Sequence, residues 1–246
     1  MNTCAIVPVY NHAVPATRVV AALGALPLPC VVVDDGSEPG AAASLARLAA
    51  PGRVEVVRHA RNLGKGAAVI SGLRRAAELG FSHALQIDAD GQHDVQEAPR
   101  LLAAAAAAPD AVVTGFPRYD ASVPRGRYYG RYATHVWVWI NTLSRRIVDS
   151  MCGFRVYPIA PVLALLERER VGRRMDFDVE ILVRLDWDGV RIVNVPVTVR
   201  YPPGTVSHFR LWQDNVLISA MHARLFLGML ARLPRLVGRR RRSPER

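Results

Sequence analysis

The sequence contains few cysteines, a single lysine and no long uninterrupted hydrophobic run. Its three cysteines, at positions 4, 30 and 152, are too few and too scattered for a disulfide framework or a zinc site built from paired cysteines, and they favour a reducing compartment. No stretch reaches about 18 consecutive apolar residues, so we expect no simple membrane span. Met1 leads directly into a strand-like run, so we expect no signal peptide.

What the chain does contain describes a globular protein. Its 246 residues are 50% hydrophobic, with a mean hydropathy of +0.11, which excludes a disordered chain. The 18 glycines and 17 prolines are too few for a fibrous or low-complexity protein. This length can bury a substantial core as one large domain or two small ones.

The positive charge is concentrated at one end. The net charge is +11, and every basic residue except Lys65 is an arginine. Residues 232–246 carry a local net charge of +6, which leaves +5 for the other 231 residues. Such a tail suits anionic lipid or nucleic acid, or is simply solvated. The basic residues of the body are dispersed and form no nucleic-acid-binding motif, so we expect no nucleic-acid partner.

The first half of the chain alternates short β-branched runs with alanine- and leucine-rich stretches. The predicted strands cover residues 4–9, 30–34, 54–58, 83–88 and 111–115. The predicted helices between them cover residues 14–25, 41–49, 65–79 and 96–107. This alternation is typical of an α/β fold with a mostly parallel, Rossmann-like sheet covered by helices on both faces. Ligands bind such sheets beyond the carboxyl ends of the strands.

The second half is less regular. Residues 118–131 are typical of a loop, and residues 132–148 form an apolar, aromatic stretch in which Trp137 and Trp139 pack into protein or face a membrane interface. We expect strands at 153–157 and 190–199, and helices at 159–167, 177–187 and 209–237. We therefore expect a main domain over residues 1–208. Residues 209–246 would add an amphipathic helix and an arginine-rich tail.

Two carboxylates stand at the end of the fourth predicted strand. Asp88 and Asp90 are two residues apart, so in an extended segment both can reach one cation. Gln92 continues the alternation with a neutral oxygen, and this set of oxygen ligands suits Mg²⁺ or Mn²⁺ rather than zinc. The alternative is a solvated turn in which an aspartate caps the next helix.

Two further polar clusters follow other predicted strands. Asp34 and Asp35 could bind the base or ribose of a nucleotide, or could cap a turn. Lys65 lies between two glycines at a predicted helix start, where backbone N–H groups and the helix dipole favour anions. The glycine spacing around Lys65 does not match a Walker loop.

Six motifs along the sequence resemble those of a known family. They are Val7-Pro8-Val9-Tyr10-Asn11, Val33-Asp34-Asp35-Gly36-Ser37, Asn62-Leu63-Gly64-Lys65-Gly66, Asp88-Ala89-Asp90-Gly91-Gln92-His93, Cys152-Gly153-Phe154-Arg155 and Phe177-Asp178-Val179-Glu180. In this order they resemble the inverting family 2 glycosyltransferases, which have a GT-A fold, and within them the polyprenyl-phosphate sugar synthases. The resemblance covers about residues 5–208.

The resemblance implies a role for each matching residue. The base and ribose of a UDP- or GDP-linked sugar would be held by Pro8, Tyr10, Asp34 and Asp35, with Lys65 also in the donor site. The metal ion, Mg²⁺ or Mn²⁺, would be held on the diphosphate by Asp88, Asp90 and Gln92. The phosphates of donor or acceptor would be steadied by Arg118, Arg131 and Arg155, with Arg200 closing over the donor. The chain departs from the family pattern at His12, where a glutamate is common, and at His208, where the mannose synthases tend to have lysine.

The acceptor decides which side chains act in the reaction. A lipid phosphate is already a nucleophile near neutral pH, because its second ionisation lies at about 6, and it needs no general base. Asp90, Arg118 and Arg131 would then carry the chemistry by stabilising charge on the phosphates. A hydroxyl acceptor, used by a soluble glycosyltransferase on a saccharide, lipid or protein, needs a carboxylate as base. The candidates are Asp178 and its neighbours Asp176 and Glu180, which could instead complement a helix dipole.

The predicted final helix carries an arginine stripe. On a helical wheel Arg224, Arg232 and Arg235 fall within roughly 80° of one another, and the large apolar residues lie mainly away from them. An apolar surface flanked by arginines describes an interfacial helix. We therefore expect a cytoplasmic protein that is peripheral on the inner face of a membrane and acts on a lipid-linked acceptor. The alternative is that this helix packs back on the main domain.

Overall fold

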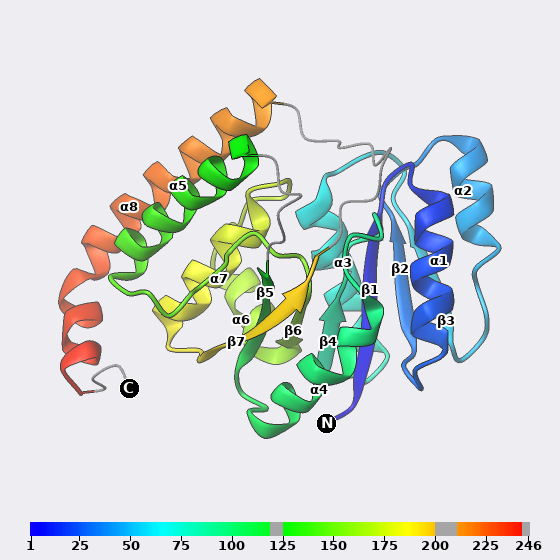
Figure 1. The fold of residues 1–246 in the computed structure, drawn as a ribbon, viewed down its shortest axis with the longest axis horizontal. Coiled ribbons are helices and arrows are strands. Elements are labelled where there is room, and N and C mark those ends of the chain that lie inside the picture. The colour runs from blue at the N-terminus through cyan, green and yellow to red at the C-terminus, as the bar shows by residue number, and fades with distance from the viewer. Residues whose placement is uncertain (119–124, 200–210, 243–246) are drawn as a thin grey trace.

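A seven-stranded mixed sheet forms the centre of the computed structural model, which describes residues 1–118, 125–199 and 211–242 (Figure 1). The strand order is β3-β2-β1-β4-β6-β5-β7. The strands are β1 (Thr3–Val9), β2 (Cys30–Asp34), β3 (Val54–Arg58), β4 (His83–Gln86), β5 (Val112–Arg118), β6 (Arg155–Pro158) and β7 (Ile192–Thr198). All pairings are parallel except those of β6 with β4 and β5. The predicted α/β fold is confirmed.

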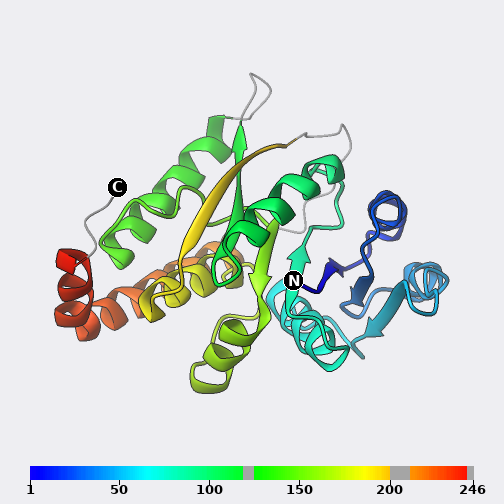
Figure 2. The same ribbon diagram turned by 90° about the horizontal axis from the view of Figure 1, so that it is seen from below.

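Helices cover both faces of this sheet. They are α1 (Ala13–Gly24), α2 (Pro39–Ala46), α3 (Lys65–Glu78), α4 (Ala98–Ala107), α5 (Arg125–Thr142), α6 (Ile159–Arg168), α7 (Phe177–Asp188) and α8 (Leu211–Arg242), with a short 3₁₀ turn at Val95–Glu97. One core joins the sheet to α1, α2 and α4, and the other joins it to α3, α6 and α7. Figure 2 shows α5 and α8 at the opposite end of the molecule from α1 and α2.

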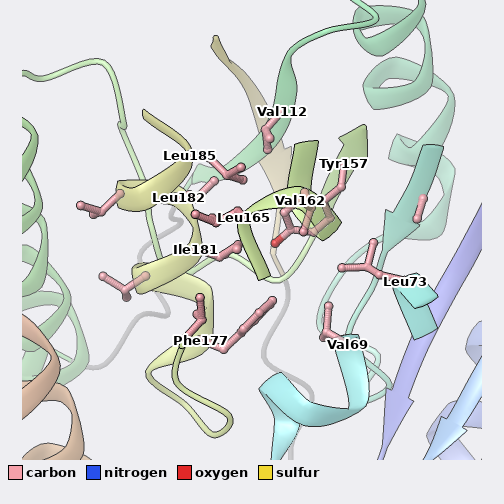
Figure 3. Close-up of a cluster of buried hydrophobic side chains, with 14 of the residues drawn as sticks. Val69, Leu73, Val112, Tyr157, Val162, Leu165, Phe177, Ile181, Leu182 and Leu185 are labelled. Atoms are coloured by element: carbon pink, nitrogen blue, oxygen red, sulfur yellow. The ribbon is translucent and has the colours of Figure 1, made fainter. Parts of the chain in front are cut away.

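The alternation of side chains along each strand explains the two cores. In β1, Cys4 and Ile6 pack on one side, while Ala5 and Val7 pack on the other, as the period of two in a strand requires. Because both faces are covered, the strands are continuously apolar rather than alternating. Figure 3 shows α3, α6 and α7 meeting over the sheet through buried side chains such as Leu73, Val162 and Phe177.

Two predicted boundaries differ from the structure. Helix α5 begins at Arg125 and ends at Thr142, whereas the sequence predicted a loop over 118–131. That segment contains Gly126 and Gly130 and repeated arginines and tyrosines, so it lacks an apolar period, and contacts with α7 and α8 decide its structure instead. Strand β4 ends at Gln86, two residues before the predicted end, so Asp88 lies in the following loop.

Helix α8 packs on the main domain, which was the alternative reading of the sequence. Met221, Leu225, Met229 and Leu236 are buried in the same core as α7. Two arginines of α8 face this contact: Arg232 Nη2 lies 2.7 Å from Glu169, and Arg239 Nη2 lies 3.2 Å from Asp186. The predicted boundary at 208–209 falls outside the described residues.

Candidate active site

The site lies where the strand order reverses. Strands β1, β2 and β3 follow one another outward in one direction, and β4 pairs with the other side of β1. The carboxyl ends of β1, β2 and β4 therefore meet at one edge, with Tyr10, Asp34 and Asp88 just beyond or at these ends. This topological switch point is where open parallel sheets bind their ligands.

Asp35 organises the glycine-lysine turn that precedes α3. Its carboxylate accepts hydrogen bonds from the backbone N–H groups of Leu63 at 2.9 Å and Gly64 at 2.8 Å, and lies 2.7 Å from Nδ1 of His59. Gly64 has a φ of +104°, a conformation that favours glycine. Because three of the roughly four acceptor directions of this carboxylate are used inside the protein, Asp35 mainly holds the turn.

For Asp34 the sequence left two roles open, binding the base or ribose of a nucleotide and capping a turn. Its buried carboxylate accepts a hydrogen bond from the N–H of Ser37 at 2.9 Å and lies 3.4 Å from Nε of Arg58. These contacts form the turn after β2, which was the alternative that the sequence left open. Pro8 is buried at the end of β1, and Tyr10 is half-buried just beyond it at the same edge.

Lys65 connects two carboxylates from distant parts of the chain. Its ammonium lies 2.7 Å from Asp88 Oδ2 and 2.7 Å from Asp178 Oδ2. Burial alone would lower the pKa of Lys65, but the charges of Asp178 and Asp88 outweigh burial and hold this pKa above its usual range. The resemblance implied a place for Lys65 in the donor site. In the structure its ammonium holds Asp88 and Asp178 together.

Arg155, for which the resemblance implied a phosphate contact, is fully buried and contacts protein groups. Its guanidinium donates to the backbone carbonyls of Asp178 at 2.7 Å and Ser150 at 2.6 Å, and to the hydroxyl of Tyr157 at 3.2 Å. It also lies 3.7 Å from the carboxylate of Asp178. The guanidinium therefore fixes the start of α7 from behind the site.

Asp88 and Asp90 keep oxygen atoms for a cation. Within the part of the chain that the structure describes, Asp88 Oδ1 is buried and has no hydrogen-bond partner, while Asp90 Oδ1 accepts a hydrogen bond from the Gln92 N–H at 3.0 Å. Burial and the neighbouring charge of Asp88 raise the pKa of Asp90 to about 6. A divalent cation would relieve both the orphaned oxygen and this repulsion, so the pair fits a metal ion.

Gly153 makes room for this carboxylate pair. A Cβ atom at Gly153 would lie 2.2 Å from Asp88 Oδ2, so any other residue would displace the carboxylate. Among the described residues no group of three or more His, Cys, Asp and Glu side chains is arranged to hold a metal.

The three acidic residues at the start of α7 are all engaged by the protein. Asp178 accepts from Lys65 and, at 3.3 Å, from Gln86 Nε2. Glu180 is fully buried and accepts from the Gly172 N–H at 2.8 Å and from Arg184. Asp176 accepts from the Arg174 N–H at 3.0 Å. Burial raises the pKa of Glu180.

The remaining predicted arginines have different surroundings. Arg118 is exposed at the carboxyl end of β5. Arg131 makes a two-pronged contact with Asp149, at 2.6 and 2.7 Å, and so ties α5 to the loop before β6. Arg200 and His208 lie outside the described residues. His12 caps the start of α1 without a side-chain capping bond.

Sequence reasoning missed Gln86, Asp149 and Gly153. Gln86 reaches the site because its position in β4 faces α7, which no local pattern reveals. Asp149 also accepts from the N–H groups of Met151 and Cys152, each at 2.8 Å. The signal for Gly153 was available, because a glycine within the motif before β6 indicates a close approach.

Comparisons with known proteins agree with this geometry. Residues 4–170 match the family model described as "Glycosyl transferase family 2". Polyprenol monophosphomannose synthase of Mycolicibacterium smegmatis is 31% identical over 226 residues, covering 80% of this chain and 77% of that protein. Undecaprenyl-phosphate mannosyltransferase of Micrococcus luteus is 30% identical over 209 residues, covering 80% and 83%.

A solved structure supports the fold. Glucosyl-3-phosphoglycerate synthase from Mycobacterium tuberculosis, in complex with Mn²⁺ and uridine-diphosphate-glucose, superposes with a TM-score of 0.65 over 94% of this chain and 78% of that chain. The sequences are 18% identical, so this likeness concerns the fold. With the family model matching well over half of the residues, this chain belongs to glycosyltransferase family 2.

Proposed function

We propose that this glycosyltransferase transfers a sugar from a nucleoside-diphosphate donor to a polyprenyl phosphate at the cytoplasmic face of a membrane. Mannose is the first sugar to test, because both relatives at 30% identity or above are mannosyl-transferring enzymes by name. The names of both relatives also contain a polyprenyl lipid, which supports this class of acceptor.

The acidic residues on α7 already accept hydrogen bonds from other protein groups, and this observation favours a phosphate acceptor over a hydroxyl. A general base must have a carboxylate oxygen within reach of the acceptor hydroxyl. Asp178 is held by Lys65 and Gln86, and Glu180 is buried behind it. A phosphate acceptor removes the need for a base, because its second ionisation at about pH 6 leaves a nucleophilic oxygen at neutral pH.

The reaction is then a single displacement. A phosphate oxygen of the acceptor forms a bond to the anomeric carbon while the bond from that carbon to the donor diphosphate breaks, with inversion at the carbon. Negative charge moves onto the leaving nucleoside diphosphate, and stabilising that charge is the main task of the site. Arg118, exposed at the sheet edge, is available for phosphate oxygens, and Lys65 keeps Asp88 and Asp178 in place.

A divalent ion would supply the remaining charge stabilisation on the diphosphate. Asp88 and Asp90 would hold it, with the side-chain oxygen of Gln92 as a further ligand. Both Mg²⁺ and Mn²⁺ suit these oxygen ligands. The unpartnered Asp88 Oδ1 and the raised pKa of Asp90 support this assignment.

The test is a donor and acceptor panel. Purified full-length protein is incubated with Mg²⁺ or Mn²⁺ and a series of UDP- and GDP-linked sugars, with and without polyprenyl phosphate, while release of nucleoside diphosphate and glycosylation of the lipid are measured. We expect lipid-dependent turnover that EDTA abolishes. Turnover on a saccharide hydroxyl that is lost in Asp178→Asn, with none on the lipid phosphate, would overturn the proposal.

An exposed apolar surface supports contact with the membrane. We call it the apolar flank, and its α5 residues are Tyr132, Trp137 and Ile140, while its α8 residues are Trp212, Val216, Leu227, Leu230, Leu233 and Val237. Each is more than a third exposed, and Trp212 is 81% exposed. Soluble surfaces rarely gather so many large apolar side chains. The basic run 239–242 at the end of α8 would add attraction to anionic headgroups.

Helix α8 is also long enough to cross a membrane. By length and composition alone, residues 212–239 are long and apolar enough to span a membrane, although the sequence alone predicted no simple span. The ion pairs of Arg232 and Arg239 with the main domain favour a helix that lies on the surface instead. Cosedimentation of the full chain with anionic vesicles tests this contact. Point substitutions in the flank are preferable to removing α8, because truncation would expose the core around Met221 and Leu225.

A further inference from the structure

A groove runs between α5 and α8 on the side of the molecule that carries the apolar flank. It encloses about 630 Å³, within the range of about 300–1,000 Å³ typical of ligand pockets. Among the described residues its walls contain no Asp, Glu, Lys or Arg side chain, and His222 is the one titratable residue in them. The volume and the uncharged walls indicate a site for an uncharged, chain-like ligand.

The walls change in polarity along the two helices. On α8 the lining changes from Asn215 and Ser219 to Phe226 and Leu227, and on α5 Thr134 comes one turn before Trp137. At 1.5 Å per residue, Leu227 lies roughly 18 Å along α8 from Asn215. The groove therefore has a polar end and an apolar end, as an amphiphile requires.

The polar end lies toward the active site. Figure 1 shows the first turns of α5 and α8 at the same end of the molecule, the end toward which β5 points. Helix α5 follows β5, whose last residue, Arg118, lies at the carboxyl edge of the sheet. A ligand in the groove would thus direct its polar head toward the edge that holds Asp88 and Asp90.

His222 contributes a buried ring to this wall. The side chain is 6% exposed, and neither ring nitrogen has a hydrogen-bond partner among residues 1–118, 125–199 and 211–242. Its ring lies 6.0 Å from that of Trp137 at an interplanar angle of 29°. Burial lowers the pKa of His222 to about 4, so the ring is uncharged at neutral pH. A neutral ring beside Trp137 leaves this part of the wall without a formal charge, which is compatible with contact by a hydrocarbon chain.

We propose that the groove between α5 and α8 receives the hydrocarbon chain of the lipid acceptor and directs its phosphate toward the sheet edge. This inference rests on the proposed function, and it names the part of the protein that recognises chain length. The apolar end contacts the chain, and the apolar flank places the opening of the groove where a membrane lipid can enter.

The first test fills the groove. Ala223→Phe on α8 and Ala133→Phe on α5 each add a ring to its wall, and Ala231→Phe adds the same ring to an exposed position of α8 outside it. The measured quantity is kcat/KM for a long-chain polyprenyl phosphate divided by kcat/KM for a water-soluble short-chain prenyl phosphate. We expect this ratio to fall about tenfold or more in both groove variants, because they exclude apolar contact area. The ratio of Ala231→Phe should match that of the unaltered protein.

Two outcomes separate the inference from the proposed function. If both acceptors are used and the ratio is unchanged in both groove variants, the inference is wrong and the function stands. If neither acceptor is glycosylated while the protein still binds or hydrolyses the donor, the proposed function itself fails.

A binding measurement gives a readout without catalysis. A polyprenyl phosphate with a nitroxide on its chain should quench the fluorescence of Trp137, measured as the difference between the unaltered protein and Trp137→Phe. Unlabelled polyprenyl phosphate should restore the signal, and a saturated phospholipid should not. Equal competition by the phospholipid would overturn the proposal in favour of a general bilayer-lipid site.

Discussion

The carboxyl edge of the sheet and the apolar flank arrange charge in opposite ways. At the edge, ionised groups lie in buried mutual contact, with Lys65 between Asp88 and Asp178. On the flank, Arg232 and Arg239 of α8 contact the main domain, while Leu227, Leu230 and Leu233 face outward. Buried charges act strongly on a substrate diphosphate because water does not screen them. Leucines that face outward are stabilised by contact with an apolar partner such as lipid. The two regions are therefore suited to the two ends of a lipid phosphate.

The largest effect on stability should come from removing the buried guanidinium of Arg155 near the carboxyl edge of the sheet. Arg155→Met leaves three oxygen acceptors without a donor, and we expect a loss of about 3–5 kcal/mol in the free energy of unfolding, measured by urea denaturation. Arg118→Met, at an exposed position, should change it by less than about 0.5 kcal/mol. If Arg155→Met has normal stability and a raised KM for the donor, Arg155 binds a donor phosphate after all.

The next effect concerns catalysis at the edge. Asp90→Asn should lower turnover about 10²–10³-fold, because a ligand to the charge-stabilising cation is weakened. Its thermal unfolding should be no lower than that of the unaltered protein, since burial and Asp88 already raise the pKa of this carboxyl. Asp110→Asn, at an exposed turn, is the matched control. Full activity of Asp90→Asn in EDTA would remove the metal from the site.

Measuring stability as a function of pH tests the burial of His222 beside the apolar flank. The pKa of His222 is about 4 in the folded protein and 6.5 in the unfolded chain, so the unfolded state binds more protons between these values. Stability should therefore fall as the pH drops from about 7 to 4, by about 2–3 kcal/mol from this residue. His222→Phe should remove that part of the pH dependence. Parallel curves for both proteins would show that His222 is not buried as a neutral ring.

The smallest effect is expected from the outward leucines. Leu227→Ser with Leu230→Ser should leave the free energy of unfolding within about 1 kcal/mol, because both side chains are exposed. Their affinity for anionic vesicles should fall about tenfold. Val14→Ser with Leu79→Ser alters two exposed apolar residues outside the flank and should bind vesicles normally. Equal vesicle binding by both double variants would exclude the flank as the membrane contact.

Much of the fold and the position of the site could be predicted from the sequence. The alternation of apolar strands and amphipathic helices requires a parallel sheet, because both faces of such strands must be covered. The polar residues after β1, β2 and β4 mark the edge where a ligand binds, since strand direction brings these ends together. The aspartates at 88 and 90 and the family motifs were also evident from local sequence.

Only the tertiary structure decided which charged groups face a substrate and which face the protein. Arg155 has the residue type of a phosphate ligand, but its place in β6 buries it against α7. The arginine stripe of α8 has the spacing of an exposed face, but Glu180 and Glu169 draw Arg224 and Arg232 toward the main domain, while Arg235 stays exposed. Local periodicity shows that residues share a face. Which way the face points depends on partners distant in sequence, because their charge and apolar area set the free energy of each orientation.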